Sequence, residues 1–414
     1  MYCTKKITSD LIWLGGSDRR LALFENVYPI PRGVSYNAYL IQDEKTALLD
    51  TVDQAIAERF FENLEHALQG KPLNYVIVNH MEPDHAATLG TVLSRYPEAT
   101  VIGNAKTLPM IKQFFPMEVE GRFQAVKEGD TLSLGRHELT FVMAPLVHWP
   151  EVMMTYDTTD KILFSADAFG TFGAMDGNIF ADEVNFEREW LDDARRYYTN
   201  IVGKYGTPVQ NVLKKAAGLD IQYLCPLHGP VWRKNIGWFL EKYKRWSTYT
   251  PEAWTAAIFC GSIYGHTENA CEILASRLAE KGVQHVKIFD VSHTDVSEQV
   301  SAAFQCSHLV FASATYNGGI YTPMETLLLE LKATLSNRPQ LIKHGLLTPR
   351  VSGHQNVQLL LHQIHPFCVM PQAVFQQDQI DGSDSIATAK QRACLEQTNG
   401  FFPATIGDVR RGGQ

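Results

Sequence analysis

The chain has 414 residues, of which 45% are apolar and 20% are charged. Single cores usually stop growing at roughly 250 to 300 residues, so this length favours two domains, and the composition argues against a disordered chain. The 45 acidic and 37 basic residues leave a formal charge of −8 without a basic stripe, which argues against nucleic acid as a partner.

No apolar stretch reaches the length of a signal peptide core or a membrane span, so we expect a cytoplasmic protein without membrane contact. The seven cysteines are scattered and form no C-x-x-C pair. This pattern is typical of reduced, structural thiols and differs from a disulfide framework or a zinc or rubredoxin knuckle.

Short strand patterns in the first half of the chain are interleaved with helical ones. The predicted strands cover residues 35–41, 46–52, 74–78, 99–103, 129–135, 137–145, 161–165 and 223–227. The predicted helices cover residues 55–68, a stretch that begins at about 84, and 187–204. This order predicts a sandwich of sheets flanked by helices up to about residue 250.

Four potential metal ligands follow the predicted strand 74–78 within six residues: His80, Glu82, Asp84 and His85. Pro83 disfavours helical geometry at Glu82, so the segment should begin as an extended or turning loop. Taken singly, His80 could be a core histidine, Glu82 a loop charge and Asp84 a helix N-cap. Four such residues together at a strand end favour a metal site.

Three further candidate ligands each end an apolar, strand-like run: His148, Asp167 and His228. Loops at strand ends are where rigid scaffolds carry functional side chains. The other ten histidines lack such a context and are interpreted as surface or packing residues, among them His66, His137, His285 and His354. No catalytic residue beyond the seven metal ligands is indicated.

The order and spacing of these pieces resemble the metallo-β-lactamase superfamily, whose hydrolases usually carry His-x-His-x-Asp-His. Here Glu82 stands where the second histidine would be. The resemblance implies two metals, with the ligands divided as His80, Glu82 and His148 on one metal, Asp84, His85 and His228 on the other, and Asp167 as the bridge. Each metal then has two imidazoles and one terminal carboxylate, which suits redox iron better than hydrolytic zinc.

Beyond about residue 250 the pattern changes to alternating strands and helices. Strands are predicted at 256–262, 283–291 and 309–315, with helices from 267 to about 281, after 291 and from about 324. This alternation predicts a parallel, doubly wound sheet. We therefore expect two domains, residues 1–250 with the metals and residues 251–414 with a second function.

Two loops of the second domain indicate a bound phosphate cofactor. The first runs directly into a helix and consists of Ser262, Ile263, Tyr264, Gly265, His266 and Thr267, whose hydroxyls and backbone N–H groups suit an anion. The second lies at the carboxyl edge of the sheet and consists of Thr315, Tyr316, Asn317, Gly318 and Gly319. A Gly-rich turn without a ligand is the alternative for the first loop. Both loops resemble those of the flavodoxin family, which implies FMN.

Together the two halves resemble the flavodiiron proteins, also called A-type flavoproteins, from near the N-terminus to about residue 336. Segments 148–150, 153–156, 165–170 and 228–233 look like that family's as well. The resemblance implies an oxidoreductase with two non-haem iron ions and FMN. It would reduce dioxygen to water, nitric oxide to nitrous oxide, or both, without indicating which gas is preferred.

The resemblance also implies partners. Because the chain has no C-x-x-C pair, the electron donor should be a separate rubredoxin-like or other small redox protein. In that family a head-to-tail homodimer, alone or as a dimer of dimers, brings the flavin of one subunit to the metals of the other.

The resemblance fades after about residue 338. A third flavin loop of the type Asn-Gly-Ser-Trp-Ala-Pro is missing there, residues 366–375 could form a strand, and we hypothesise a divergent or frame-shifted C-terminus. Two alternatives stay open: a zinc hydrolase fused to a flavodoxin-like module, and a flavin redox sensor with a structural metal.

Overall fold

The computed structural model describes residues 1–335 and 358–363. The chain divides into two compact units, Met1–Thr248 and a second unit that begins at Tyr249. None of the helices in the described residues combines the length and the apolar character that a membrane span requires.

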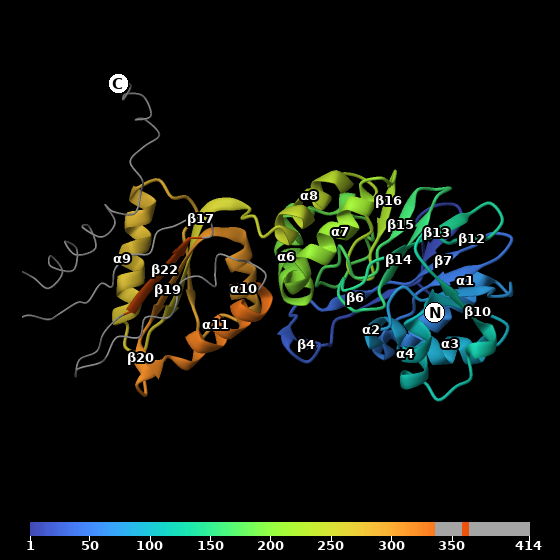
Figure 1. The fold of residues 1–414 in the computed structure, drawn as a ribbon, viewed down its shortest axis with the longest axis horizontal. Helices are drawn as coiled ribbons and strands as arrows, with labels where there is room; N and C mark the ends of the chain where they lie inside the picture. The colour runs from blue at the N-terminus through green and yellow to red at the C-terminus, as the bar shows by residue number, and fades with distance from the viewer. Residues whose placement is uncertain (336–357, 364–414) are drawn as a thin grey trace, which may run out of the picture. The chain divides into compact units, whose positions relative to one another are not determined.

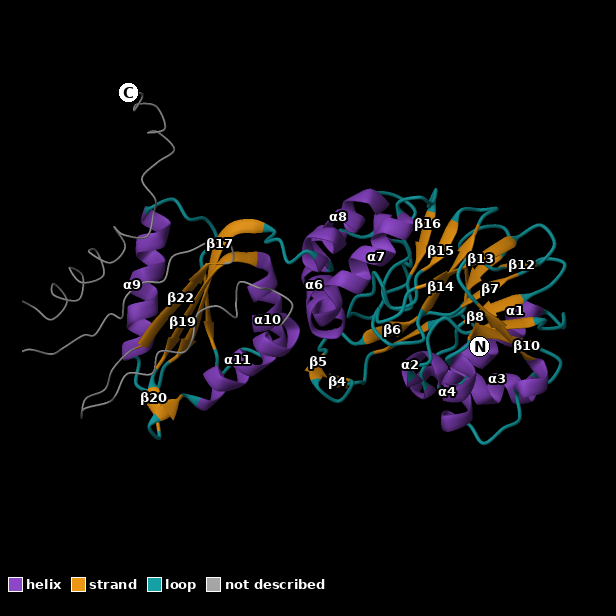
Figure 2. Cartoon of the chain, viewed as in Figure 1, coloured by secondary structure: helices purple, strands orange, loops and turns teal. Residues whose placement is uncertain are grey.

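The first unit is built on two sheets, shown as arrows in Figures 1 and 2. The larger sheet has the order β1-β2-β7-β8-β9-β10-β11 and the smaller one β12-β13-β14-β15-β16. The larger sheet comprises β1 (Lys5–Lys6), β2 (Leu11–Trp13), β7 (Tyr39–Ile41), β8 (Ala47–Leu49), β9 (Tyr75–Ile77), β10 (Thr100–Asn104) and β11 (Phe123–Val126). The smaller comprises β12 (Thr131–Ser133), β13 (Glu138–Met143), β14 (Met153–Asp157), β15 (Ile162–Phe164) and β16 (Tyr223–Cys225).

Two short strand pairs complete the β structure of this unit: β3 (Gly16–Asp18) with β6 (Val34–Tyr36), and β4 (Leu23–Phe24) with β5 (Tyr28–Pro29). Strands such as β8 and β15 are buried along their whole length. Burial on both faces explains why they read as continuous apolar runs in the sequence.

The α-helices of the first unit cover the outer faces of the two sheets. They are α1 (Ala57–Leu68), α2 (Pro83–Ala86), α3 (Leu89–Arg95), α4 (Thr107–Phe114), α5 (Phe186–Glu189), α6 (Leu191–Tyr197), α7 (Gly206–Ala216) and α8 (Ile236–Ser247). Single turns are η1 (Gln54–Ile56), η2 (Glu120–Arg122), η3 (Ala181–Glu183), η4 (Tyr198–Val202) and η5 (Gly203–Tyr205). In Figure 2, α3 and α4 lie beside β10, and α7 and α8 beside β15 and β16. The unit is therefore the expected αββα sandwich.

Three predicted elements of the first unit are interrupted, and one of them, the helix predicted from about residue 84, divides into α2 and α3. The strand predicted at 35–41 splits into β6 and β7 at the buried Asn37, whose Oδ1 accepts from the Trp13 indole at 2.9 Å. The Asn37 amide donates to the backbone oxygens of Pro226 and Gly229, both at 2.9 Å. The Asn37 amide thus satisfies backbone oxygens on either side of His228. These partners are far away in the sequence, so no local pattern predicts the break.

The helix predicted at 187–204 is also broken, into α5, α6, the π-type turn η4 and the 3₁₀ turn η5. Such π-type turns are rare and occur often at functional sites. Here the turn follows Tyr197, which lies against the metal-binding groups described below.

The second unit contains a sheet of order β18-β17-β19-β22. Its elements are β17 (Ala253–Gly261), α9 (His266–Glu280), β18 (Lys287–Asp290), α10 (Val296–Gln305), β19 (Cys306–Ser313), β20 (Thr315–Tyr316), β21 (Gly319–Ile320), α11 (Thr322–Leu335) and β22 (Gln358–Gln363). Strands β18, β17 and β19 are parallel. Figure 1 shows α9 on one face of the sheet and α10 with α11 on the other, as in a doubly wound fold.

Strand β22 pairs antiparallel with β19, so the edge of this parallel sheet has the opposite direction. It lies in the part of the chain where the family resemblance fades. The expected site of the third flavin loop, after 338, and the possible strand at 366–375 lie outside the described residues. The hypothesis of a divergent C-terminus stays a prediction.

Candidate metal centre

The segment after β9 begins extended and then forms a short helix. Glu82 has φ −59° and ψ 140°, so the prediction of a non-helical residue before Pro83 is confirmed. Glu82 is itself the N-cap residue of α2, and Asp84 lies in the first turn. The alternative that Asp84 caps the helix is wrong, because Pro83 places the helix start two residues earlier than that reading assumed.

Three strand ends of the smaller sheet bring the other candidate ligands to this segment. His148 follows β13, Asp167 follows β15 and His228 follows β16. Strand β15 lies between β14 and β16, so the loops after β15 and β16 are neighbours. The structure brings all seven candidate ligands together, in two adjoining groups that share Asp167.

The first group contains His80, Glu82, His148 and Asp167. Oε2 of Glu82 lies 3.0 Å from Nε2 of His80 and 2.9 Å from Nε2 of His148. Oδ2 of Asp167 lies 3.3 Å and 3.2 Å from the same two nitrogens. Two imidazoles and two carboxylates therefore point at one position.

The second group contains Asp84, His85 and His228. The Nε2 atoms of the two imidazoles are only 3.1 Å apart. Oδ2 of Asp84 lies 3.3 Å from His85 and 3.2 Å from His228. Oδ1 of Asp167, the oxygen that faces away from the first group, lies 3.0 Å from His85 and 3.6 Å from His228. The carboxylate of Asp167 thus presents one oxygen to each group, the geometry of a bridging ligand.

The ligand side chains are mostly buried, and burial and the charges of neighbouring ligands shift the pKa of several of them. Burial lowers the pKa of His148, but the carboxylates of Asp167 and Glu82 outweigh this and raise it to about 9. Burial likewise opposes protonation of His80, whereas Asp167, Glu151 and Glu82 raise its pKa well above the usual range. For Glu82 the two effects have opposite signs to those at the histidines. Burial raises the pKa of the carboxyl group, but His148 and His80 outweigh burial and hold this pKa below its usual value. The carboxylates therefore favour the protonated form of the His80 and His148 imidazoles.

Several polar atoms fit bound cations better than hydrogen bonds. Both carboxylate oxygens of Asp84 and Oδ1 of Asp167 are buried without a hydrogen-bond partner. Two imidazole nitrogens that face each other at 3.1 Å can share a proton or a metal ion. Since buried polar groups are rarely left unpaired, the donor set fits two divalent cations.

Residues behind the ligands hold them in orientation. Nδ1 of His228 lies 2.8 Å from the backbone oxygen of Ser35, and Nδ1 of His80 lies 2.9 Å from Oε1 of Glu151. The buried Asp50 accepts from the backbone N–H groups of Asn79 and His80 at 2.7 and 3.2 Å. Burial raises the pKa of Asp50 to about 6 against these hydrogen bonds.

Sequence reasoning missed three residues of this site. Glu151 lies three positions after His148, and that proximity was an available signal. Tyr197 is buried beside His228, with ring centroids 5.4 Å apart, and its hydroxyl has no hydrogen-bond partner. Glu25 lies in the β4–β5 turn, where partial desolvation and the Glu82 carboxylate raise its pKa to about 8. No local pattern marks Tyr197 or Glu25.

A third cluster, Asp10, His137 and Asp160, does not resemble the other two. Arg136 forms ion pairs with both aspartates, so a cation is already in place. His137 is buried and its Nδ1 lies 2.8 Å from Oδ2 of the buried Asp157. The cluster is therefore a structural charge network, consistent with the interpretation of His137 as a packing residue.

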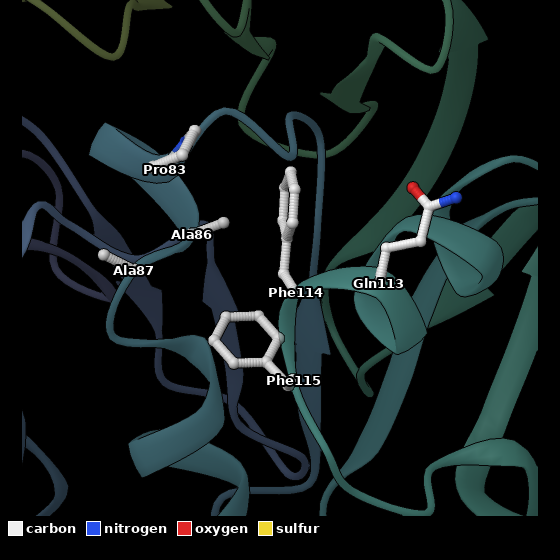
Figure 3. Close-up of a pocket in the computed structure, with 6 residues that line it drawn as sticks. All are labelled: Pro83, Ala86, Ala87, Gln113, Phe114 and Phe115. Atoms are coloured by element: carbon white, nitrogen blue, oxygen red, sulfur yellow. The ribbon is translucent and has the colours of Figure 1, made fainter.

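A pocket of about 360 Å³ lies beside α2, with the rings of Phe114 and Phe115 facing that helix (Figure 3). It is lined by Pro83, Ala86, Ala87, Gln113, Phe114 and Phe115. None of the seven candidate ligands lines it, so the pocket is not part of the metal-binding groups.

In the second unit, the two predicted cofactor loops begin side by side, because Gly261 of β17 pairs with Ser313 of β19. Ser262 Oγ accepts from the N–H of Gly265, which has φ +84° and precedes α9. Thr267 is buried in the first turn, whereas Ile263 and Tyr264 are exposed. The first N–H groups of a helix lack partners within it, so this turn can hold a phosphate.

The second loop is a tight hairpin. Strands β20 and β21 pair around Asn317 and Gly318, which both have positive φ, and Tyr316 is exposed beside them. The exposed ring of Tyr316, which contacts the ring of Tyr321, could offer a flat surface to a planar cofactor. His266 is the first residue of α9.

The chain is similar to known proteins in sequence. Residues 34–229 match the family described as ODP family beta lactamase. The chain is 32% identical over 330 residues to the anaerobic nitric oxide reductase flavorubredoxins of Klebsiella pneumoniae and Escherichia coli, which covers 78% of this chain and 68% of either relative.

Solved structures are similar as well. The flavodiiron protein from Giardia intestinalis superposes with a TM-score of 0.76 at 26% identity and covers 81% of both chains. The rubredoxin oxygen:oxidoreductase from Desulfovibrio gigas superposes with a TM-score of 0.75 at 27% identity, covering 82% of this chain and 83% of that one.

Proposed function

This chain belongs to the flavodiiron protein family and is an oxidoreductase, and from that premise we propose that it reduces dioxygen to water, nitric oxide to nitrous oxide, or both. We further propose that His80, Glu82, Asp84, His85, His148, Asp167 and His228 hold two iron ions. Electrons would reach them through FMN held by the loops 262–267 and 315–319.

The observation that carries the proposal is the composition of the two ligand groups. Each offers two imidazoles and one terminal carboxylate, and Asp167 presents one oxygen to either group. Three carboxylates reduce the charge of two divalent ions, which favours higher oxidation states. A hydrolytic zinc pair profits instead from residual positive charge that acidifies bound water.

When bound, two iron ions supply one-electron redox chemistry to a diatomic gas, and FMN supplies electrons from an external carrier. The chain's residues do the remaining work. His80, His85 and His228 are at most 1% exposed, so these three imidazoles are shielded from bulk water. The ring of Tyr197 lies beside His228, and its hydroxyl, which has no hydrogen-bond partner, interacts electrostatically with Asp167 and Asp84 and could donate a hydrogen bond toward the centre.

The partners belong to the same proposal. A small redox protein of the rubredoxin type would deliver electrons, a proposal supported by the similarity to the rubredoxin oxygen:oxidoreductase from Desulfovibrio gigas. A head-to-tail homodimer, or a dimer of dimers, would bring the flavin of one subunit to the metals of the other. A strictly monomeric enzyme with full activity would contradict this part.

Gas consumption by anaerobically prepared protein of measured iron and FMN content tests the proposal. We expect two iron ions and one FMN per chain, and consumption of dioxygen, nitric oxide or both with a chemical reductant. The same assay with each gas separately gives the preference. Two zinc ions and no gas consumption would instead support the alternative of a zinc hydrolase with a flavodoxin-like module.

A further inference from the structure

Glu151 is a buried carboxylate that belongs to neither metal-binding group. It is 1% exposed, and its Oε1 lies 2.9 Å from Nδ1 of His80 while also accepting from the backbone N–H of Met81 at 2.9 Å. Its second oxygen has no hydrogen-bond partner. Because an unpaired buried carboxylate is costly, the contact with His80 is what accounts for a charge at this position.

The backbone around Glu151 is held in place independently of that contact. The side-chain amide of Asn104 donates to the backbone oxygen of Glu151, and Lys106 donates to the backbone oxygen of Pro150 at 3.2 Å. The carboxylate is therefore presented to His80 from a fixed segment. Its position fixes Nδ1 of His80 as the donor and leaves Nε2 directed at Glu82 and Asp167.

In the second group no carboxylate accepts a hydrogen bond from an imidazole Nδ1, although the buried Asp50 interacts electrostatically with His85. Nδ1 of His228 faces the neutral backbone oxygen of Ser35 at 2.8 Å, and Nδ1 of His85 is buried without a partner. A carboxylate behind an imidazole makes that imidazole a stronger electron donor than a backbone carbonyl does. The two ligand groups have the same composition, but only the first has a carboxylate in contact with Nδ1 of one of its histidines.

We propose that Glu151 is a positioning residue that makes the two metal positions electronically inequivalent. It holds His80 in the metal-binding tautomer and adds negative charge beside the position formed by His80, Glu82 and His148. This inference rests on the proposed iron centre. The position next to Glu151 stabilises ferric iron more strongly, so it has the lower of the two reduction potentials.

The variant Glu151→Gln tests the charge, since the amide oxygen can still accept from His80 and Met81. A matched control is Asp157→Asn, which neutralises a carboxylate of similar burial against a histidine, His137, outside the metal-binding groups. In Glu151→Gln we expect about 10- to 100-fold weaker iron binding at one position, the range typical of residues behind metal ligands. The lower reduction potential rises and the upper one stays unchanged.

Iron-57 Mössbauer spectroscopy and a potentiometric titration read these effects without turnover. In Glu151→Gln only one of the two iron signals should shift, and in Asp157→Asn neither. Unchanged potentials and binding in Glu151→Gln, or an equal shift of both signals, would overturn the inference.

A measurement on the unaltered protein keeps the inference testable if Glu151→Gln does not fold. The two irons should then differ in reduction potential and fill in sequence when the metal-free protein is titrated. Equal potentials and simultaneous filling would overturn the inference. A chain that binds no iron at all would instead remove the proposed function, so the two failures are distinguishable.

Discussion

Gly229 directly follows His228, and its substitution by alanine should lower the free energy of unfolding and disturb the metal site. Gly229 has φ +78°, and an added Cβ would lie 2.1 Å from Cγ2 of Thr171. The left-handed conformation costs an alanine about 1 to 2 kcal/mol, and overpacking adds about 1 to 3 kcal/mol. We expect Gly229→Ala to lower the free energy of unfolding by about 2 to 5 kcal/mol.

Gly70→Ala is the matched control, because Gly70 has φ +82° and nothing lies within 4 Å of the added Cβ. Gly70→Ala has only the cost of placing an alanine in the left-handed conformation, about 1 to 2 kcal/mol. The lower conformational entropy of the unfolded chain stabilises both variants alike. Denaturant unfolding gives both values, so the difference between them isolates the contact with Thr171.

The double variant Thr171→Ser with Gly229→Ala removes the methyl group that the new Cβ meets. The serine hydroxyl can still donate to the backbone oxygen of Phe172, as the threonine does. A double-mutant cycle should therefore show a favourable coupling of about 1 to 3 kcal/mol. Iron bound by the group of His228 should be lost in Gly229→Ala and recovered in the double variant. Equal destabilisation of Gly229→Ala and Gly70→Ala, or no coupling, would refute the reasoning.

Two predictions concern the metals themselves. Asp84→Ala should lose the ion of the second position only, whereas Asp167→Ala should lose both ions, because Asp167 faces both groups. Metal analysis after anaerobic reconstitution checks this. Full occupancy of the second position in Asp167→Ala would count against Asp167 as the bridge. In the metal-free protein the pKa of His148 is raised to about 9, so the imidazole is protonated at pH 7 and a metal must displace its proton. Metal affinity should then increase as the pH rises toward 9, and calorimetry in two buffers of different ionisation enthalpy should detect released protons at pH 7.

Much of the site could be predicted from the sequence because its ligands are local or follow strands. His80, Glu82, Asp84 and His85 lie within six residues, and Pro83 by itself makes the segment begin extended, as the structure has it. The cofactor loops at 262–267 and 315–319 follow parallel strands, whose carboxyl ends meet at one edge of the sheet. These features depend on short-range sterics and on strand order.

Other features depend on contacts between residues far apart in the chain. Asn37 interrupts a predicted strand because its amide serves backbone oxygens almost 190 residues away, at 2.9 Å from Pro226. Tyr197 lies beside the ring of His228, a contact between residues 31 positions apart, and it stands where the predicted helix changes from α6 into a π-type turn. Hydrophobic periodicity carries no information on either requirement.

The sequence by itself determined which donor atoms are available and that they gather at strand ends, since both follow from residue type and local backbone preference. The family resemblance of the sequence already implied how the seven residues divide, and the tertiary structure adds the geometry, with one oxygen of Asp167 toward each group. Only the tertiary structure placed Glu151 behind His80 and a neutral carbonyl behind His228. The physical reason is that this geometry and the charge asymmetry arise from packing two sheets together, which brings residues some 70 to 190 positions apart within hydrogen-bond distance.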